Sequence, residues 1–430
     1  MIYSIHTLGC PKNDADSAVL AALIEQNGHK VTTDVENADR VLINTCGFIL
    51  DARQESIDAL LQFSRNRAHP NQQIIGWGCL VQRYGQELIR EIPEIDGWIG
   101  VQDLEAVYRL LESSKPIRFS SQPPDPMHNL FRQKVSRGQA SAYVKIGDGC
   151  DRACGFCSIP SFKGVHRSRP WAKIIQEMED LVTQGIKEMI LVDQDTTQYQ
   201  DGPVGLPELL RRIDGIEGDF WIRVLYIHPD HLSKDLISTM IGLPKVLPYF
   251  DLPTQHGSDA MLQRMNRKKN RIQLLEQIQS IRALDPLASI RSTVIVGCPE
   301  ETDGDFDLLM DFVQRASFDH LGCFIYSMEE GTAMEQKEPV PVSVAKDRQE
   351  QIMMAQEEIS AIILQNWIGK ELRVLVEERE PDGYVGRSFR DAPEIDGMVW
   401  LNSHAPLRLG DFVLCRVVDS MEHDLVGDVL

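Results

Sequence analysis

The chain has 430 residues, which is long enough for two to four domains and too long for one small binding module. Its 64 acidic residues outnumber 44 basic ones and give a net charge of −20, which argues against bulk coating of nucleic acid or anionic lipid and favours a basic partner. No apolar run approaches the ~18 residues that span a bilayer, so we expect a cytoplasmic protein without membrane contact.

The first third of the chain alternates β-type and helical segments. The β-type runs cover residues 2–8, 41–45 and 73–78, and the helical segments cover residues 14–27, 51–66 and 82–91. This order predicts a parallel α/β domain over residues 1–112. A cysteine follows each run, and the carboxyl ends of parallel strands share one edge, so we expect Cys10, Cys46 and Cys79 to converge there.

A proline-rich stretch, residues 113–140, interrupts the pattern and predicts a linker. Six short apolar runs then recur with helical segments between them, at residues 143–146, 189–192, 221–226, 249–252, 290–296 and 321–326. They predict a partial (βα)6 barrel over residues 141–338, whose chemistry lies in the loops that follow the strands.

The last part of the sequence predicts one long helix followed by a small all-β barrel. The helix covers residues 342–366 within a connecting segment, 339–368, and β-type runs at 372–376, 398–401 and 412–418 indicate the barrel over residues 369–430. The barrel holds seven Lys or Arg against 13 Asp or Glu, a net charge of −6. A nucleic-acid-binding barrel normally has the opposite sign, so we expect nucleic acid contact to be at most incidental.

The strongest motif is a cysteine trio after the first predicted barrel strand. Cys150, Cys154 and Cys157 have C-x-x-x-C-x-x-C spacing, with which one tight loop can present three thiolates to three corners of an iron–sulfur cube. The fourth iron then lacks a protein ligand and is open to a substrate or cofactor. The alternatives are an inert set of buried thiols or zinc, which would need a fourth ligand nearby, and the nearest downstream candidate is His166.

Taken singly, Cys10, Cys46 and Cys79 are typical of inert strand-end cysteines. Their equivalent positions at one sheet edge instead favour a second three-cysteine cluster, with its own open iron that could carry a sulfur atom. The chain has nine cysteines, an odd number without an export signal, which indicates metal or redox chemistry rather than disulfides. We interpret Cys298, Cys323 and Cys415 as structural.

The cysteine loop and the predicted barrel resemble the radical S-adenosylmethionine superfamily. The resemblance implies a [4Fe-4S] cluster on Cys150, Cys154 and Cys157, with S-adenosylmethionine chelated at the open iron and cleaved to a radical. It also implies that Phe156 lies against the adenine and that Ile295 and Gly297, in segment 294–297, contact it. Radical chemistry of this kind attacks unactivated C–H bonds.

Over its whole length the sequence is similar to the methylthiotransferases, which have two branches. One branch modifies an adenosine of transfer RNA, and the other modifies an aspartate of small-ribosomal-subunit protein twelve. Five segments resemble the second branch: residues 8–13, 159–170, 192–199, 326–332 and 386–397. The resemblance implies two [4Fe-4S] clusters, the use of S-adenosylmethionine as both radical source and methyl donor, and transfer of a methylthio group to the aspartate β-carbon.

The implied partners are the ribosomal protein, free or on its subunit, and an electron donor. Two other functions stay open: methylthiolation of transfer RNA, and a non-catalytic scaffold with zinc at one or both trios. Smaller signals have two interpretations each. Asp193 and Asp195 either line the cofactor site or cap a helix, His228 and His231 have metal-like spacing or form a polar loop, and the basic residues 163–169 either hold a carboxylate or are solvated.

Overall fold

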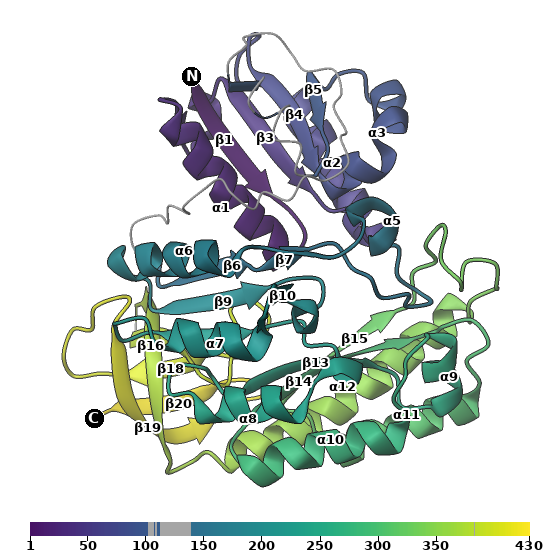
Figure 1. Cartoon of the computed structure of the whole chain (residues 1–430), viewed down its shortest axis with the longest axis vertical. Helices are drawn as coiled ribbons and strands as arrows, with labels where there is room; N and C mark the ends of the chain where they lie inside the picture. Colours follow the sequence, from purple (N-terminus) through teal and green to yellow (C-terminus); the bar gives the residue numbers. More distant parts are fainter. Residues whose placement is uncertain (102–106, 108–109, 112–138, 382) are drawn as a thin grey trace.

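The computed structural model describes residues 1–101, 107, 110–111, 139–381 and 383–430. An N-terminal α/β unit lies above a middle region of parallel strands and helices, and a C-terminal β-barrel packs at the lower left of that region (Figure 1). None of the helices in the described part of the chain combines the length and apolar character that a membrane span requires. The predicted linker lies outside the described residues except for Gln139 and Ala140.

The N-terminal unit is a five-stranded parallel sheet with the order β2-β1-β3-β4-β5. Its strands are β1 (Ile2–Thr7), β2 (Lys30–Val31), β3 (Arg40–Thr45), β4 (Gln73–Gly78) and β5 (Gly97–Ile99). Its helices are α1 (Pro11–Gln26), η1 (Val35–Asn37), α2 (Leu50–Arg65) and α3 (Cys79–Glu91). Alternate residues of β3 face opposite sides, because Leu42 packs with α1 while Val41 and Ile43 pack with α2 and α3.

This sheet confirms the predicted α/β class, with two helix starts that differ from the expected ones. Helix α1 begins at Pro11 rather than at residue 14, because proline fits the first helical position and Cys10 serves as the N-cap residue. Helix α3 begins directly at Cys79 after Gly78, whose φ of 105° turns the chain sharply.

The middle region consists of two three-stranded parallel sheets, β6-β9-β12 and β13-β14-β15. The strands are β6 (Ser141–Lys145), β9 (Glu188–Val192), β12 (Trp221–Val224), β13 (Tyr249–Gln255), β14 (Ser289–Val296) and β15 (His320–Ile325). Ile222 of β12 bonds the segment that leads into β13, since its N–H donates to the carbonyl of Lys245 and its carbonyl accepts from the Leu247 N–H, both at 2.8 Å, and β12 lies against β13. The six strands therefore form the open arc of a partial (βα)6 barrel, as the sequence predicts.

Helices and short elements connect these strands. The helices are α5 (Ile159–Lys163), α6 (Trp171–Thr183), α7 (Leu206–Asp214), α8 (Lys234–Gly242), α9 (Asp259–Arg264), α10 (Arg271–Leu284) and α11 (Asp303–Ala316). The short elements are β7 (Gly147–Asp148), β8 (Arg167–Ser168), η2 (Thr196–Gln198), β10 (Gln200–Asp201), β11 (Val204–Gly205) and η3 (Pro229–His231). One apolar core fills the space between the arc and its helices, and it includes Met189 and Leu191 of β9.

The long helix and the C-terminal barrel are also as expected. Helix α12 (Val342–Gln365) leads into a closed barrel with the order β16-β17-β18-β20-β19. Its strands are β16 (Glu371–Glu380), β17 (Gly383–Ser388), β18 (Val399–Asn402), β19 (Phe412–Ser420) and β20 (Leu425–Val429). The sequence prediction lacked β17 and β20, because glycines at 383, 386 and 427 interrupt their apolar pattern.

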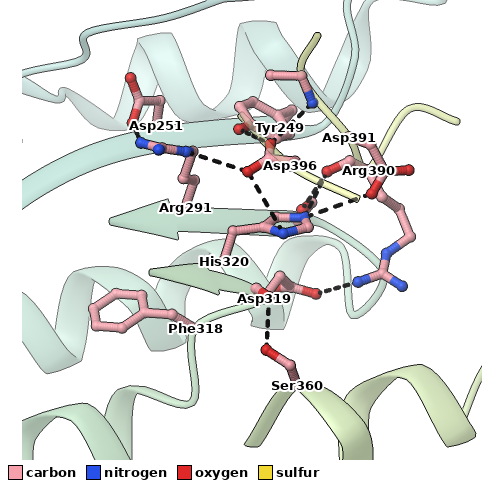
Figure 2. Close-up of polar contacts among 12 residues, drawn as sticks. Tyr249, Asp251, Arg291, Phe318, Asp319, His320, Ser360, Arg390, Asp391 and Asp396 are labelled. Atoms are coloured by element: carbon pink, nitrogen blue, oxygen red, sulfur yellow. Dashed lines mark hydrogen bonds and ion pairs between the residues drawn. The ribbon is translucent and has the colours of Figure 1, made fainter. Parts of the chain in front are cut away.

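Buried charges fix the C-terminal unit against the middle region. Figure 2 shows His320 of β15 facing Asp396, with His320 Nδ1 at 3.5 Å from the carboxylate and Arg291 Nε at 3.3 Å from it. Arg390 bonds Asp319 at 3.1 Å, and its own carbonyl lies 2.9 Å from His320 Nε2. These contacts lie among residues removed from water, so they define one docking orientation.

Candidate functional site

The N-terminal cysteines converge at one edge of the sheet, as predicted. They follow β1, β3 and β4, which are adjacent in the sheet order. A Cβ atom at Gly9 would lie 3.2 Å from Cys46 Sγ, and one at Gly47 would lie 2.8 Å from the Cys79 carbonyl oxygen. The three loops can approach this closely because both positions lack a side chain, and Gly9 has a φ of +98°.

Asn13 holds these loops together, a role that the sequence analysis did not assign. The side-chain Nδ2 of this buried residue donates to the backbone carbonyl of Leu8 at 2.6 Å, and the backbone carbonyl of Asn13 accepts from Asn44 Nδ2 at 2.9 Å. Its Oδ1 lies 4.0 Å from Cys79 Sγ. A buried amide with partners on three segments links the geometry of the first cysteine loop to the other two.

The second trio lies in the tight loop between β7 and α5. The Cys150 N–H donates to the carbonyl of Gly164 at 3.0 Å, and the Cys157 N–H donates to that of Cys154 at 3.2 Å. The Arg152 N–H and Gln198 Nε2 donate to Cys150 Sγ at 3.4 and 3.5 Å. Donors aimed at sulfur stabilise a thiolate, which is the form that binds metal.

The donor chemistry of both trios fits a cationic occupant. Burial raises the pKa of Cys46 and of Cys157 to about 12 each, so these thiols hold their protons until a cation replaces them. No group of three or more His, Cys, Asp or Glu side chains among the described residues is arranged to hold a single metal ion. An iron–sulfur cube differs, because it takes each thiolate at a separate iron.

Phe156 and Ile295 come together from distant parts of the chain beside this loop. Both are partly exposed and pack on one small apolar cluster, which consists of Met261, Met265, Cys298, Tyr326 and Met334. Position 297 requires glycine for packing, since a Cβ there would lie 2.5 Å from the Cβ of Ala345 on α12. Phe156 and Ile295 thus place partly exposed apolar side chains on one cluster beside the cysteine loop, while Gly297 allows α12 to approach.

Polar groups line the same edge of the arc. Asp195 both caps η2, accepting from the Thr197 N–H at 2.9 Å, and pairs with Arg152 of the cysteine loop at 2.7 Å. Ser158 Oγ and Gln194 Oε1 are buried without a hydrogen-bond partner among the described residues. Buried polar atoms without a partner fit a ligand that supplies hydrogen-bonding groups at this edge.

Two of the smaller sequence signals have structural partners. His166 Nε2 lies 2.8 Å from the buried carboxylate of Asp193, whose pKa burial raises to about 6. His228 faces Arg267 and caps η3, and burial together with that guanidinium lowers its pKa to about 2. Both nitrogens of His228 are engaged, so it does not act as a free metal ligand in this arrangement.

Both cysteine trios lie at the contact between the N-terminal unit and the arc. Cys79 packs against Phe162 of α5, the helix that follows Cys157. Lys145 of β6 bonds Asp16 of α1 and Asp148 of β7, each at 2.8 Å. Helix α1 packs against β6, and α5 packs against α3 (Figure 1).

A second ionic contact joins the two units. The buried carboxylate of Glu329, in the loop after β15, pairs with Arg83 of α3 at 2.7 Å and with Arg53 of α2 at 2.5 Å. Ser327 of the same loop accepts from the Leu50 N–H at 3.2 Å. These contacts hold the sheet edge that carries Cys46 and Cys79 against the loop that follows β15 of the arc.

Comparisons with known proteins match all three units. Family models match residues 2–100 ("Uncharacterized protein family UPF0004"), 144–313 ("Radical SAM superfamily") and 368–430 ("TRAM domain"). The chain is 45% identical over 437 residues to "Ribosomal protein uS12 methylthiotransferase RimO" of Thermotoga maritima, covering 100% of both sequences. The chain belongs to the ribosomal protein uS12 methylthiotransferase family. The family and branch inferred from sequence motifs are confirmed.

Other relatives and solved structures agree with this placement. The uS12 methylthiotransferases of Pseudothermotoga lettingae and Thermosipho africanus are 44% and 43% identical, each with 100% coverage of both sequences. The radical S-adenosylmethionine methyltransferase TsrM from Kitasatospora setae superposes with a TM-score of 0.58 at 13% identity, over 78% of this chain and 77% of that one. OxsB, a cobalamin-dependent S-adenosylmethionine radical enzyme, gives 0.54 at 12% identity, over 82% and 56%. These two structures support the fold alone.

Proposed function

We propose that this chain attaches a methylthio group to the β-carbon of an aspartate in ribosomal protein uS12 by radical S-adenosylmethionine chemistry. The observation that carries the proposal is the 45% identity over the full length of both sequences to a uS12 methylthiotransferase. Two cysteine trios at one contact between units support it, because the reaction must break a C–H bond and deliver sulfur at the same carbon.

In this proposal Cys150, Cys154 and Cys157 hold one [4Fe-4S] cluster, and the trio that follows β1, β3 and β4 holds a second. When bound, the first cluster with S-adenosylmethionine would supply the means to break an unactivated C–H bond, and the second would supply the sulfur. The residues of the chain have supporting tasks. Gln198 orients Cys150, Asn13 fixes the three N-terminal loops, and Glu329 holds the two sites together.

We also propose that an external electron donor serves the enzyme and that the reaction takes place in the cytoplasm. The uS12 substrate is a ribosomal protein, and the acidic chain, with its net charge of −20, suits a basic partner. Contact with transfer RNA has weaker support, since the C-terminal barrel has a net charge of −6.

Mass spectrometry of uS12 tests the proposed function. Incubation with the cluster-loaded enzyme, S-adenosylmethionine and a reductant should add one methylthio group, and fragmentation should place it on an aspartate. A parallel reaction with transfer RNA should give no methylthio-adenosine. Unmodified uS12, or modified transfer RNA, would contradict the substrate assignment and leave the cysteine chemistry to be explained otherwise.

Phe156 is proposed to bind the adenine of S-adenosylmethionine, with Ile295 and Gly297 contributing to that site. Replacing Phe156 with leucine keeps apolar contact with the methionine-rich cluster but removes the ring face. Because stacking of a base on an aromatic ring contributes roughly 1–3 kcal/mol, the Kd for S-adenosylmethionine should rise about tenfold. Equilibrium dialysis measures this directly. Phe156→Tyr retains the ring and should bind normally, whereas equal losses in both variants would point to packing rather than stacking.

A further inference from the structure

Lys12 stands out among the cations at the contact between the two units. Lys145 pairs with Asp16, Lys163 lies 3.4 Å from Asp148, and Arg152 pairs with Asp195. The Lys12 ammonium has no hydrogen bond or ion pair within the described parts of the chain. Its contact there is the face of the Tyr226 ring, with Nζ 3.5 Å from the centroid.

The position of Lys12 does not serve the helix that carries it. Lys12 is the second residue of α1, where the helix dipole disfavours a positive charge. Tyr226 is also constrained, since it has a left-handed φ of 58° and its N–H donates to Asp251 at 2.8 Å. A disfavoured charge held by a strained aromatic residue is typical of a binding site rather than of a structural contact.

The surroundings of Lys12 match the reacting end of the substrate. Lys12 comes two residues after Cys10 of the first trio, and its contact Tyr226 follows β12 of the arc, so the ammonium lies where the N-terminal unit meets the arc. The carboxylate of an aspartate is bonded directly to its β-carbon. A cation that holds this carboxylate therefore places the β-carbon beside the sulfur-delivering trio. The Tyr226 ring covers one side of the ammonium and leaves its other donors for carboxylate oxygens.

We propose that Lys12, oriented by Tyr226, binds the carboxylate of the target aspartate and so determines which side chain is methylthiolated. This assignment rests on the proposed function and adds a substrate-recognition residue to it. Lys12 approaches the carboxylate and not the reacting carbon, so it is a specificity residue. The basic residues 163–169, which sequence analysis offered for this role, include Lys163 and His166, and both already have carboxylate partners.

A double-mutant cycle tests the assignment. The affinity of the cluster-loaded enzyme is measured for uS12 and for uS12 with the target aspartate replaced by asparagine. Wild-type enzyme should prefer aspartate by about tenfold, as expected for a hydrogen bond to a charged group. In Lys12→Gln the affinity for aspartate should fall to that for asparagine, and the affinity for asparagine should not change.

Matched variants separate this role from others. Lys173→Gln removes an exposed charge on α6, and Arg167→Gln removes a cation that follows the cysteine loop. Both should keep the tenfold preference, and Lys12→Gln should keep the wild-type electron paramagnetic resonance spectrum. A preference that survives in Lys12→Gln, or that disappears in Arg167→Gln instead, would overturn the assignment alone. Wild-type enzyme that neither binds nor modifies uS12 would overturn the proposed function as well.

Discussion

Replacement of Cys150 with alanine is expected to abolish cleavage of S-adenosylmethionine, whereas replacement of Cys10 should leave 5′-deoxyadenosine formation intact and stop methylthiolation. The two trios lie in separate loops, one after β7 and one at the edge of the N-terminal sheet, so each can lose its cluster without the other. Chromatography of 5′-deoxyadenosine and mass spectrometry of uS12, run on the same reaction, measure the two effects separately.

The other members of each trio should behave like Cys150 or Cys10 respectively. Cys415→Ala provides the control, because this thiol is buried in the core of the C-terminal barrel and belongs to neither trio. This variant should retain both activities. Methylthiolated product from the Cys10, Cys46 or Cys79 variants would contradict the division of labour between the trios.

Iron and sulfide analysis of the same proteins tests the occupants. Two four-iron clusters require about eight iron atoms and eight sulfides per chain, and a variant in either trio should retain about half of each. A zinc scaffold would contain no labile sulfide. This measurement does not depend on the substrate, so it separates the cluster assignment from the uS12 assignment.

The fold was predictable from sequence wherever strands are continuous and apolar. β3 and β9 are buried along their entire length and contain the short apolar runs 41–43 and 189–192, as parallel strands covered on both faces do. β2 and β5 have only two and three residues, too short for any periodicity to appear. β17 contains Gly383 and Gly386, and Gly386 is required because a Cβ there would lie 2.2 Å from the Leu375 carbonyl oxygen.

The residues of the candidate site also fall into those that the sequence predicts and those that it does not. Spacing and topology are properties of the sequence, so the two trios could be proposed as ligands before their loops were seen. Asn13, Gln198 and Lys12 were missed because their roles come from neighbours that the sequence does not place beside them. Lys12, for example, meets Tyr226, which follows a strand of another unit. The informative signal was a lysine in the first turn of a helix, where charge rules disfavour it.

Replacement of Glu188 with glutamine should produce the largest loss of stability among single substitutions outside the cysteines. Glu188 of β9 is fully buried, and it pairs with Arg223 of β12 at 2.7 Å and with Arg387 of the C-terminal barrel. Glutamine leaves the buried guanidinium of Arg223 without its counterion and Arg387 with Glu377 alone, and breaking a buried pair in this way costs about 3–5 kcal/mol. Urea denaturation of the full chain should therefore show a lower midpoint, beginning with separation of the barrel from the arc.

The exposed pair of Glu371 and Arg416, at 2.8 Å on the barrel surface, provides the matched control. Glu371→Gln should cost no more than about 1 kcal/mol, because solvent screens this pair. Equal losses in the two variants would contradict the argument from burial.

The contribution of Glu188 should also depend on pH in a defined direction. Burial alone would raise its pKa, but Arg387 and Arg223 outweigh burial and lower the pKa from 4.5 to about 2. A carboxylate whose pKa is lower in the folded state stabilises the fold fully above the unfolded pKa and loses this effect as the pH falls through the folded pKa. The difference in unfolding free energy between wild type and Glu188→Gln should therefore be constant near neutral pH and shrink as the pH falls from 4.5 towards 2. A difference that is unchanged across this range would show that Glu188 acts through packing, because only a charge interaction titrates with the carboxylate.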